Sequence, residues 1–141
     1  MIRLSGFLLS AIFAALGMFH IYWAAGGTLG KGATIPEIAG KRAFNPSPVS
    51  TILVAIALMI AMLVILGRLG VLGKSVPQWV FRWGTWGISI LFFLRAIGEF
   101  KLVGFFKLVR DTEFARWDTW LFSPLCLVIA VIAFALAFKE A

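Results

Sequence analysis

Four long apolar stretches, separated by more polar connections, dominate the pattern of residues along this chain. Backbone polar groups in lipid must be hydrogen-bonded internally, and the stretches lack the alternating pattern of a barrel strand. Each is close to the roughly 20 residues that a helix needs to cross a bilayer. The sequence therefore predicts an all-α polytopic membrane protein, a bundle of four transmembrane helices over residues 4–25, 49–66, 79–97 and 119–138.

The composition supports the same class. Hydrophobic residues make up 62% of the chain and charged residues 13%, and the mean hydropathy is +1.01. A chain of 141 residues cannot hide so much apolar surface in one water-soluble core, so we expect a single membrane domain over residues 1–141. The formal charge is +7, and the basic residues flank the apolar stretches. This placement predicts membrane lipids as partners, and it argues against nucleic acid.

The connections differ in character. The first, residues 26–48, contains five glycines and three prolines, which predicts an irregular segment; long structured loops of this kind are often functional. In the third, a narrow polar stripe on an apolar background is formed by Lys101, Gly104, Lys107 and Asp111. That pattern predicts a short interfacial helix over residues 99–110.

The last span has its own start signals. Asp111 or Thr112 can cap a helix that begins before the membrane, and Pro124 should kink this helix near its entry, where it frees the carbonyl of Trp120. Gly84 and Gly87 should thin one side of the third span and let a neighbouring helix approach.

Ionisable side chains gather at one end of the predicted bundle. Arg95 and Glu99 lie four residues apart at the end of the third span and can form an ion pair, and an ionised group at membrane depth costs about 2.5–3.5 kcal/mol. His20 ends the first span on the same side, and Asp118 opens the fourth. Either these groups are structural, with Asp118 paired to Arg116 or to the helix dipole, or they form a site beneath the first connection.

The functional alternative predicts specific roles. Acid–base chemistry would fall to His20, Glu99 and Asp118, with Arg95 stabilising an anion. Ligand binding would use Trp23, Lys31, Arg42, Arg95 and Ser123. One histidine and one cysteine are too few for a zinc site or a haem with two such ligands, so we predict no metal and no cofactor. Whether the protein is an enzyme stays open.

Two runs of residues and one arginine between them resemble a known family. They are the run HIYWAAGG from His20 to Gly27, Arg95, and the run FARWDTWLFSPLC from Phe114 to Cys126. Together they resemble a bacterial family of small four-span integral membrane proteins known only as a domain of unknown function. The resemblance covers nearly the whole chain and implies a multi-pass protein of the bacterial plasma (inner) membrane. It implies no activity.

The sequence is compatible with three functions. The leading hypothesis is a ligand-binding bundle that holds an amphiphilic or anionic small molecule in a polar pocket at one membrane face, with Arg95 as the anchor. The second is a small transporter or channel that works as a homodimer. The third is a structural or assembly subunit of a membrane complex. The side of the first and third connections has more basic residues than the other side, which favours a cytoplasmic location for these connections under the positive-inside rule. The excess becomes small when Arg95 is counted as membrane-embedded, so the orientation is close to undecided.

Overall fold

The computed structural model describes residues 1–138 and confirms the all-α membrane architecture. The helices that are long and apolar enough to cross a bilayer are α1 (Ile2–Ala24), α3 (Pro48–Arg68), α4 (Gln78–Ile97) and a last helix, Glu113–Phe138. This last helix comprises α5 (Glu113–Trp117), the π-helical turn η1 (Asp118–Phe122) and α6 (Ser123–Phe138). The first connection holds α2 (Lys31–Thr34) and the strands β1 (Glu37–Ile38) and β2 (Lys41–Arg42).

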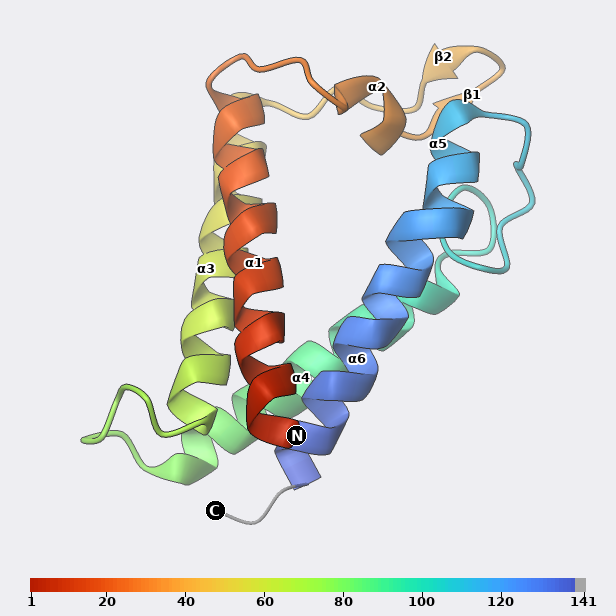
Figure 1. Cartoon of the computed structure of the whole chain (residues 1–141). Coiled ribbons are helices and arrows are strands. Elements are labelled where there is room, and N and C mark those ends of the chain that lie inside the picture. Colours follow the sequence, from red (N-terminus) through yellow and green to blue (C-terminus); the bar gives the residue numbers. More distant parts are fainter. Residues whose placement is uncertain (139–141) are drawn as a thin grey trace.

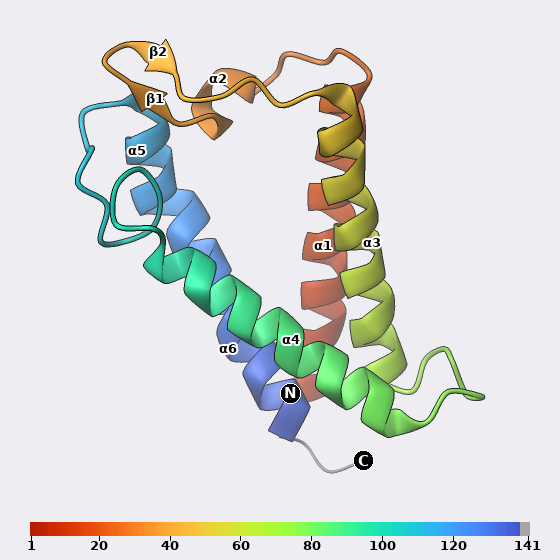
Figure 2. The same cartoon turned by 180° about the vertical axis from the view of Figure 1, so that it is seen from behind.

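The membrane helices form two pairs. α1 packs along α3, and α4 packs along α6. The pairs converge near the N-terminus and diverge toward the opposite end, where the first connection bridges them (Figures 1 and 2). This arrangement leaves the molecule wide at the end where the sequence concentrates its ionisable groups.

The outer faces of these helices are apolar and exposed. No more than 39% of any span is buried inside the protein. The core includes Leu9 and Phe13 of α1, Ile65 of α3 and Ile129 of α6, all fully buried. Because exposed leucines, valines and phenylalanines are distributed along all the spans, lipid is the solvent that covers them.

The first connection is more ordered than the sequence predicts. α2 forms one helical turn, and β1 and β2 pair as an antiparallel hairpin. The indole Nε1 of Trp23 donates to the carbonyl of Leu29 at 2.8 Å, which ties the connection to the end of α1. α2 packs against α5, and Ile35 is buried beside it. The connection is therefore fixed at both helix pairs.

The prediction of an interfacial helix over residues 99–110 is wrong. α4 ends at Ile97 and is followed by Gly98, whose φ is 82°; Phe100 also has a positive φ, of 68°. The chain then folds back, so that the amide of Phe105 donates to the carbonyl of Ala96 at 2.9 Å. No polar stripe forms, because Lys107 is buried inside the fold. The stabilisation of that ammonium group, described below, outweighs the local helical pattern.

The last helix begins as the sequence predicts and then widens. The hydroxyl of Thr112 accepts a hydrogen bond from the amide of Ala115 at 3.1 Å, which is an N-cap. The π-helical turn lies immediately before Pro124, and in it the amide of Ser123 donates to the carbonyl of Asp118, five residues back. A proline cannot donate to the preceding turn, and the wider turn accommodates it. Asp118 opens this turn.

Candidate functional site

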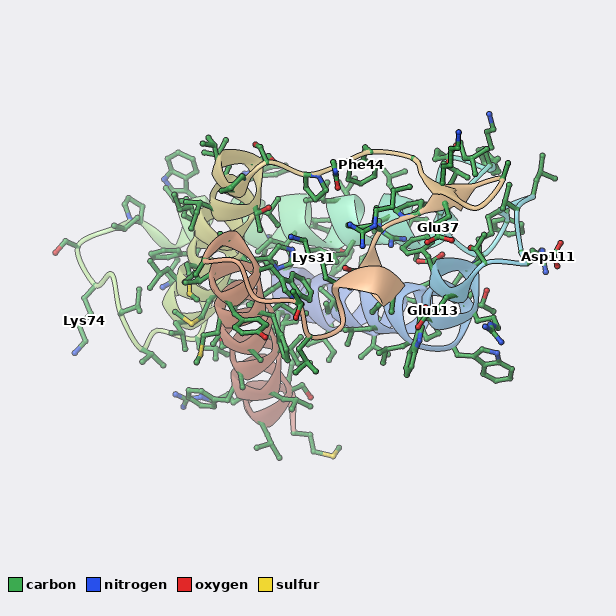
Figure 3. All side chains as sticks on the ribbon, turned by 90° about the horizontal axis from the view of Figure 1, so that it is seen from above. Lys31, Glu37, Phe44, Lys74, Asp111 and Glu113 are labelled. Atoms are coloured by element: carbon green, nitrogen blue, oxygen red, sulfur yellow. The ribbon has the colours of Figure 1, made fainter. Side chains whose placement is uncertain are left out.

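A cavity of about 330 Å³ lies beneath the first connection. It is bordered by the end of α1, the start of α3, α2 and the segment that follows the hairpin. The residues that line it are His20, Trp23, Lys31, Thr34, Ile35, Phe44, Pro46, Ser50, Thr51 and Val54. Seen from above, Lys31 lies in the middle of the molecule between α1 and α4, while Glu37 and Glu113 lie toward α5 (Figure 3).

The imidazole of His20 is held in one orientation. Its Nδ1 lies 2.8 Å from the carbonyl oxygen of Leu16, and its ring meets the indole of Trp23 edge-on at a centroid distance of 5.1 Å. Because a carbonyl oxygen only accepts, Nδ1 must carry a proton. In the neutral ring, Nε2 is then an acceptor, and within residues 1–138 it has no hydrogen-bond partner.

Lys31 gives the cavity its charge. It is partly buried, and no carboxylate lies among the residues that line the cavity. Across the described part of the chain, its ammonium group has no hydrogen-bond or ion-pair partner. The N-terminus of α3, capped by Ser47, also opens at this cavity through Ser50 and Thr51, and a helix N-terminus carries partial positive charge. The cavity is therefore electropositive.

The hydroxyl groups in the cavity are engaged with the backbone. Thr34 donates to the carbonyl of Lys31 at 3.0 Å, and Ser50 and Thr51 both donate to the carbonyl of Ser47 at 2.9 Å. Their oxygens still have lone pairs for a donor on a ligand. The donors free for an anion are those of Lys31. The remaining walls are apolar, so the cavity suits a molecule that is both charged and apolar.

A second polar feature is a buried charge cluster, which we define as Arg95, Lys107 and Asp118. Arg95 Nη2 lies 2.9 Å from Asp118 Oδ1, and Lys107 Nζ lies 3.0 Å from Oδ2. The amide of Gly104 also donates to Oδ2, at 2.8 Å. The carboxylate is completely buried, so these three donors replace the water that it has lost.

The hydrogen-bonding groups of Lys107 are as fully paired as those of Asp118. Besides the carboxylate, its ammonium group donates to the carbonyl of Gly104 at 3.0 Å and to the hydroxyl of Thr119 at 2.7 Å. An ammonium group has three donors, and all three are used. The charge cluster thereby joins the end of α4, the third connection and the start of the last helix.

The charge cluster is not neutral. Two cations face one carboxylate, which leaves one net positive charge. Arg95 is 33% exposed, and its Nη1 is buried without a hydrogen-bond partner in the described residues. The same holds for the hydroxyl of Ser123, which is completely buried. These two atoms retain unused hydrogen-bonding capacity.

The structure divides the sequence-predicted site residues between these two features. His20, Trp23 and Lys31 meet in the cavity, and Arg95 meets Asp118 in the charge cluster. Ser123 is buried one turn beyond Asp118. The remaining two lie outside both features: Arg42 is exposed on β2, and the exposed Glu99 accepts a hydrogen bond from the amide of Leu102.

Two predicted contacts need correction. Arg95 does not pair with Glu99, because α4 ends between them and Gly98 turns the chain away. Asp118 does not pair with Arg116, which is exposed; its partners are Arg95 and Lys107. The four ionisable groups of the predicted site therefore do not form one set of contacts.

Sequence reasoning missed several residues of both features. The sequence pattern puts Lys107 on the polar stripe of an interfacial helix, although a lysine with apolar neighbours on both sides in a glycine-broken segment is a signal for burial. Ser50 and Thr51 follow the Ser-Pro start of α3, which marks a helix N-terminus and hence a region of positive potential. Thr34 and Phe44 carry no signal of their own, because the folding of the first connection places them.

Comparison with known proteins gives a family and no activity. Neither a curated protein nor a solved structure shows significant similarity to the chain. The model of the family described as a protein of unknown function, DUF3995, matches residues 13–133. This range includes the ends of the spans that form the cavity and all three residues of the charge cluster. The chain therefore belongs to the DUF3995 family, and it is a member whose four apolar helices mark it as a multi-pass membrane protein.

Proposed function

We propose that this protein binds an anionic amphiphile, with the charged head of the ligand in the cavity beneath the first connection. The observation that carries the proposal is the Lys31 ammonium group, which is partly buried and unpaired within residues 1–138, in a cavity with no lining carboxylate. Removing a cation from water without a partner is unfavourable. An anionic headgroup supplies that partner.

The rest of the cavity fits the same ligand class. A carboxylate or phosphate oxygen accepts from Lys31, and the α3 N-terminus adds favourable potential. The Nε2 of His20 and the hydroxyl oxygens of Ser50 and Thr51 accept from a hydroxyl or a protonated oxygen on the head. Trp23 and Phe44 cover the apolar part of the ligand next to its head.

Binding has more support than catalysis. Of the predicted acid–base residues, His20 lines the cavity, whereas Asp118 is enclosed in the charge cluster and Glu99 is exposed elsewhere. Proton transfer at the ligand would therefore depend on His20 alone. Arg95, the anchor expected from the sequence, is engaged with Asp118, and Lys31 takes that role in the proposal. The setting that we propose is the bacterial plasma membrane.

Removal of Lys31 tests the proposal. In nanodiscs of phosphatidylcholine, the Lys31→Ala variant should bind dodecyl phosphate about 10- to 100-fold more weakly than the wild type, because a charge-assisted hydrogen bond contributes about 1.5–3 kcal/mol. Isothermal titration calorimetry measures the affinity. Lys41→Ala is the matched control: the same residue type in the same connection, but exposed on β2 and outside the cavity.

The control separates a site from general surface attraction. The proposal expects Lys41→Ala to bind dodecyl phosphate with nearly the wild-type affinity. Equal losses in the two variants would mean that the anion is attracted by the net charge of the surface. An unchanged affinity in Lys31→Ala would also refute the proposal.

A further inference from the structure

An apolar groove of about 470 Å³ runs along the membrane-facing side of the protein between α3 and α4. On α3 its lining extends from Val54 to Val64, and on α4 from Gly84 to Phe92. Every residue that lines it is apolar or glycine. Val54 also lines the cavity beneath the first connection, so the groove and the cavity adjoin at this residue, and from there the groove runs along α3 toward Val64.

The groove is wedge-shaped, and its glycines show this. A Cβ atom added at Gly84 would lie 2.8 Å from Cγ1 of Val64, so the helices are in close contact there. A Cβ atom added at Gly87, one turn nearer the cavity, would have no neighbouring atom within 4 Å. The groove therefore narrows toward the end where the helix pairs converge and widens toward the cavity. The ribbons of α3 and α4 diverge in the same direction (Figure 2).

We infer that this groove holds the hydrocarbon chain of the amphiphile whose head occupies the cavity, an inference that rests on the proposed function. The cavity and the groove adjoin at Val54, so a head in the cavity and a chain in the groove can belong to one molecule. Between Val54 and Val64 an α-helix rises about 15 Å, which is enough for a chain of medium length. Gly87 and Leu91 are exposed, so the chain enters sideways from the lipid.

The groove positions the chain but does not drive binding. Lipid tails are as apolar as these side chains, so moving a chain from the bilayer into the groove gives no hydrophobic gain. The gain is van der Waals contact with α3 and α4, and the head at Lys31 keeps the chain from diffusing away. The ligand class is accordingly a lipid-like molecule with an anionic head and at least one alkyl chain.

Photolabelling tests the position of the chain. The probe is dodecyl phosphate with a diazirine at the far end of the chain, bound to the full protein in phosphatidylcholine nanodiscs. We expect label on the α3 segment 57–64 and the α4 segment 84–91. Gly87→Phe fills the open end of the groove without meeting a neighbour at Cβ, and it should lower this label about tenfold or more. Gly87→Ala, which leaves most of the space free, should keep it.

The outcomes separate the two proposals. If Lys31→Ala weakens binding of the probe but the wild-type label is spread over all lipid-facing helices, the groove inference is overturned and the proposed function stands. If the label in the groove does not depend on Lys31, the proposed function fails. Crosslinks that join two copies of the chain through the α3 and α4 segments would show a second copy in the groove and would overturn the inference. The circular dichroism spectrum of Gly87→Phe should match that of the wild type, which shows that a loss of label in this variant reflects the filled groove and not misfolding. Equal label in Gly87→Phe and in the wild type would refute the groove inference.

Discussion

The Asp118→Ala variant is expected to lose about 3–5 kcal/mol of unfolding free energy, because the substitution leaves the buried Lys107 ammonium without its counter-charge. Lys107 is 2% exposed and Asp118 is fully buried, so water cannot replace the missing carboxylate. The amide of Gly104 loses its acceptor at the same time. Unfolding in mixed micelles of increasing denaturing-detergent fraction, followed by tryptophan fluorescence, measures the change.

Two further variants give this prediction its controls. Asp111→Ala removes an exposed carboxylate just before the same helix and should change stability by about 0.5 kcal/mol or less. The double variant Lys107→Met/Asp118→Ala should be more stable than Asp118→Ala, since it removes the unpaired buried cation. Equal stabilities of Asp118→Ala and Asp111→Ala would contradict the buried charge cluster.

Gly104→Ala should destabilise the protein by about 2–4 kcal/mol, through backbone strain and the loss of a hydrogen bond to a carboxylate. Gly104 has a φ of 91°, which side-chain-bearing residues rarely adopt. A Cβ atom there would lie 2.2 Å from the carbonyl oxygen of Ile97 and 2.6 Å from the Cα of Gly98, and backbone atoms cannot move aside cheaply. The third connection would have to open at the charge cluster. The same mixed-micelle unfolding titration measures the loss of unfolding free energy.

Gly32→Ala is the matched control for this variant. A Cβ atom at Gly32 meets nothing within 4 Å, and Gly32 lies in the short helix α2, where alanine is the better helix former. We expect unchanged or slightly increased stability. If Gly104→Ala were as stable as Gly32→Ala, the close return of the third connection onto the end of α4 would be refuted.

The membrane spans could be predicted because their signal is local. Each stretch of apolar residues is long enough by itself to define a helix, and Thr112 is a capping residue next to such a stretch. The third connection could not be predicted in this way. Its polar residues have helical spacing, but Gly98 breaks the helix and Lys107 finds a carboxylate 11 residues further along the chain. A tertiary contact overrides the local pattern there.

In the candidate site, too, the local contacts could be predicted from the sequence and the tertiary contacts could not. His20 and Trp23 lie three residues apart on one helix face, so their proximity follows from the sequence. The partner of Arg95 does not, because Glu99 is close in sequence and Asp118 is 23 residues away. Only the end of α4 at Gly98 decides between them. The cavity itself depends on how the first connection folds, and glycine and proline content indicates irregularity without specifying a path.

The charge cluster and the cavity are connected through α5. The charge cluster fixes the start of the last helix, and α2, which carries Lys31 and Thr34 into the cavity, packs against α5. The charge cluster therefore supports one wall of the cavity without lining it. We expect Asp118→Ala to weaken the binding of dodecyl phosphate as well as stability, whereas Lys31→Ala should weaken binding alone.

The most direct test of anionic amphiphile binding is native mass spectrometry of the protein released from nanodiscs formed directly from the membranes of its host. We expect the wild type and Lys41→Glu to retain one anionic amphiphile per chain, and Lys31→Glu to retain none, since the reversed charge repels the head. A wild-type protein without a bound anionic amphiphile, or a Lys31→Glu variant that retains one, would refute anionic amphiphile binding in the cavity.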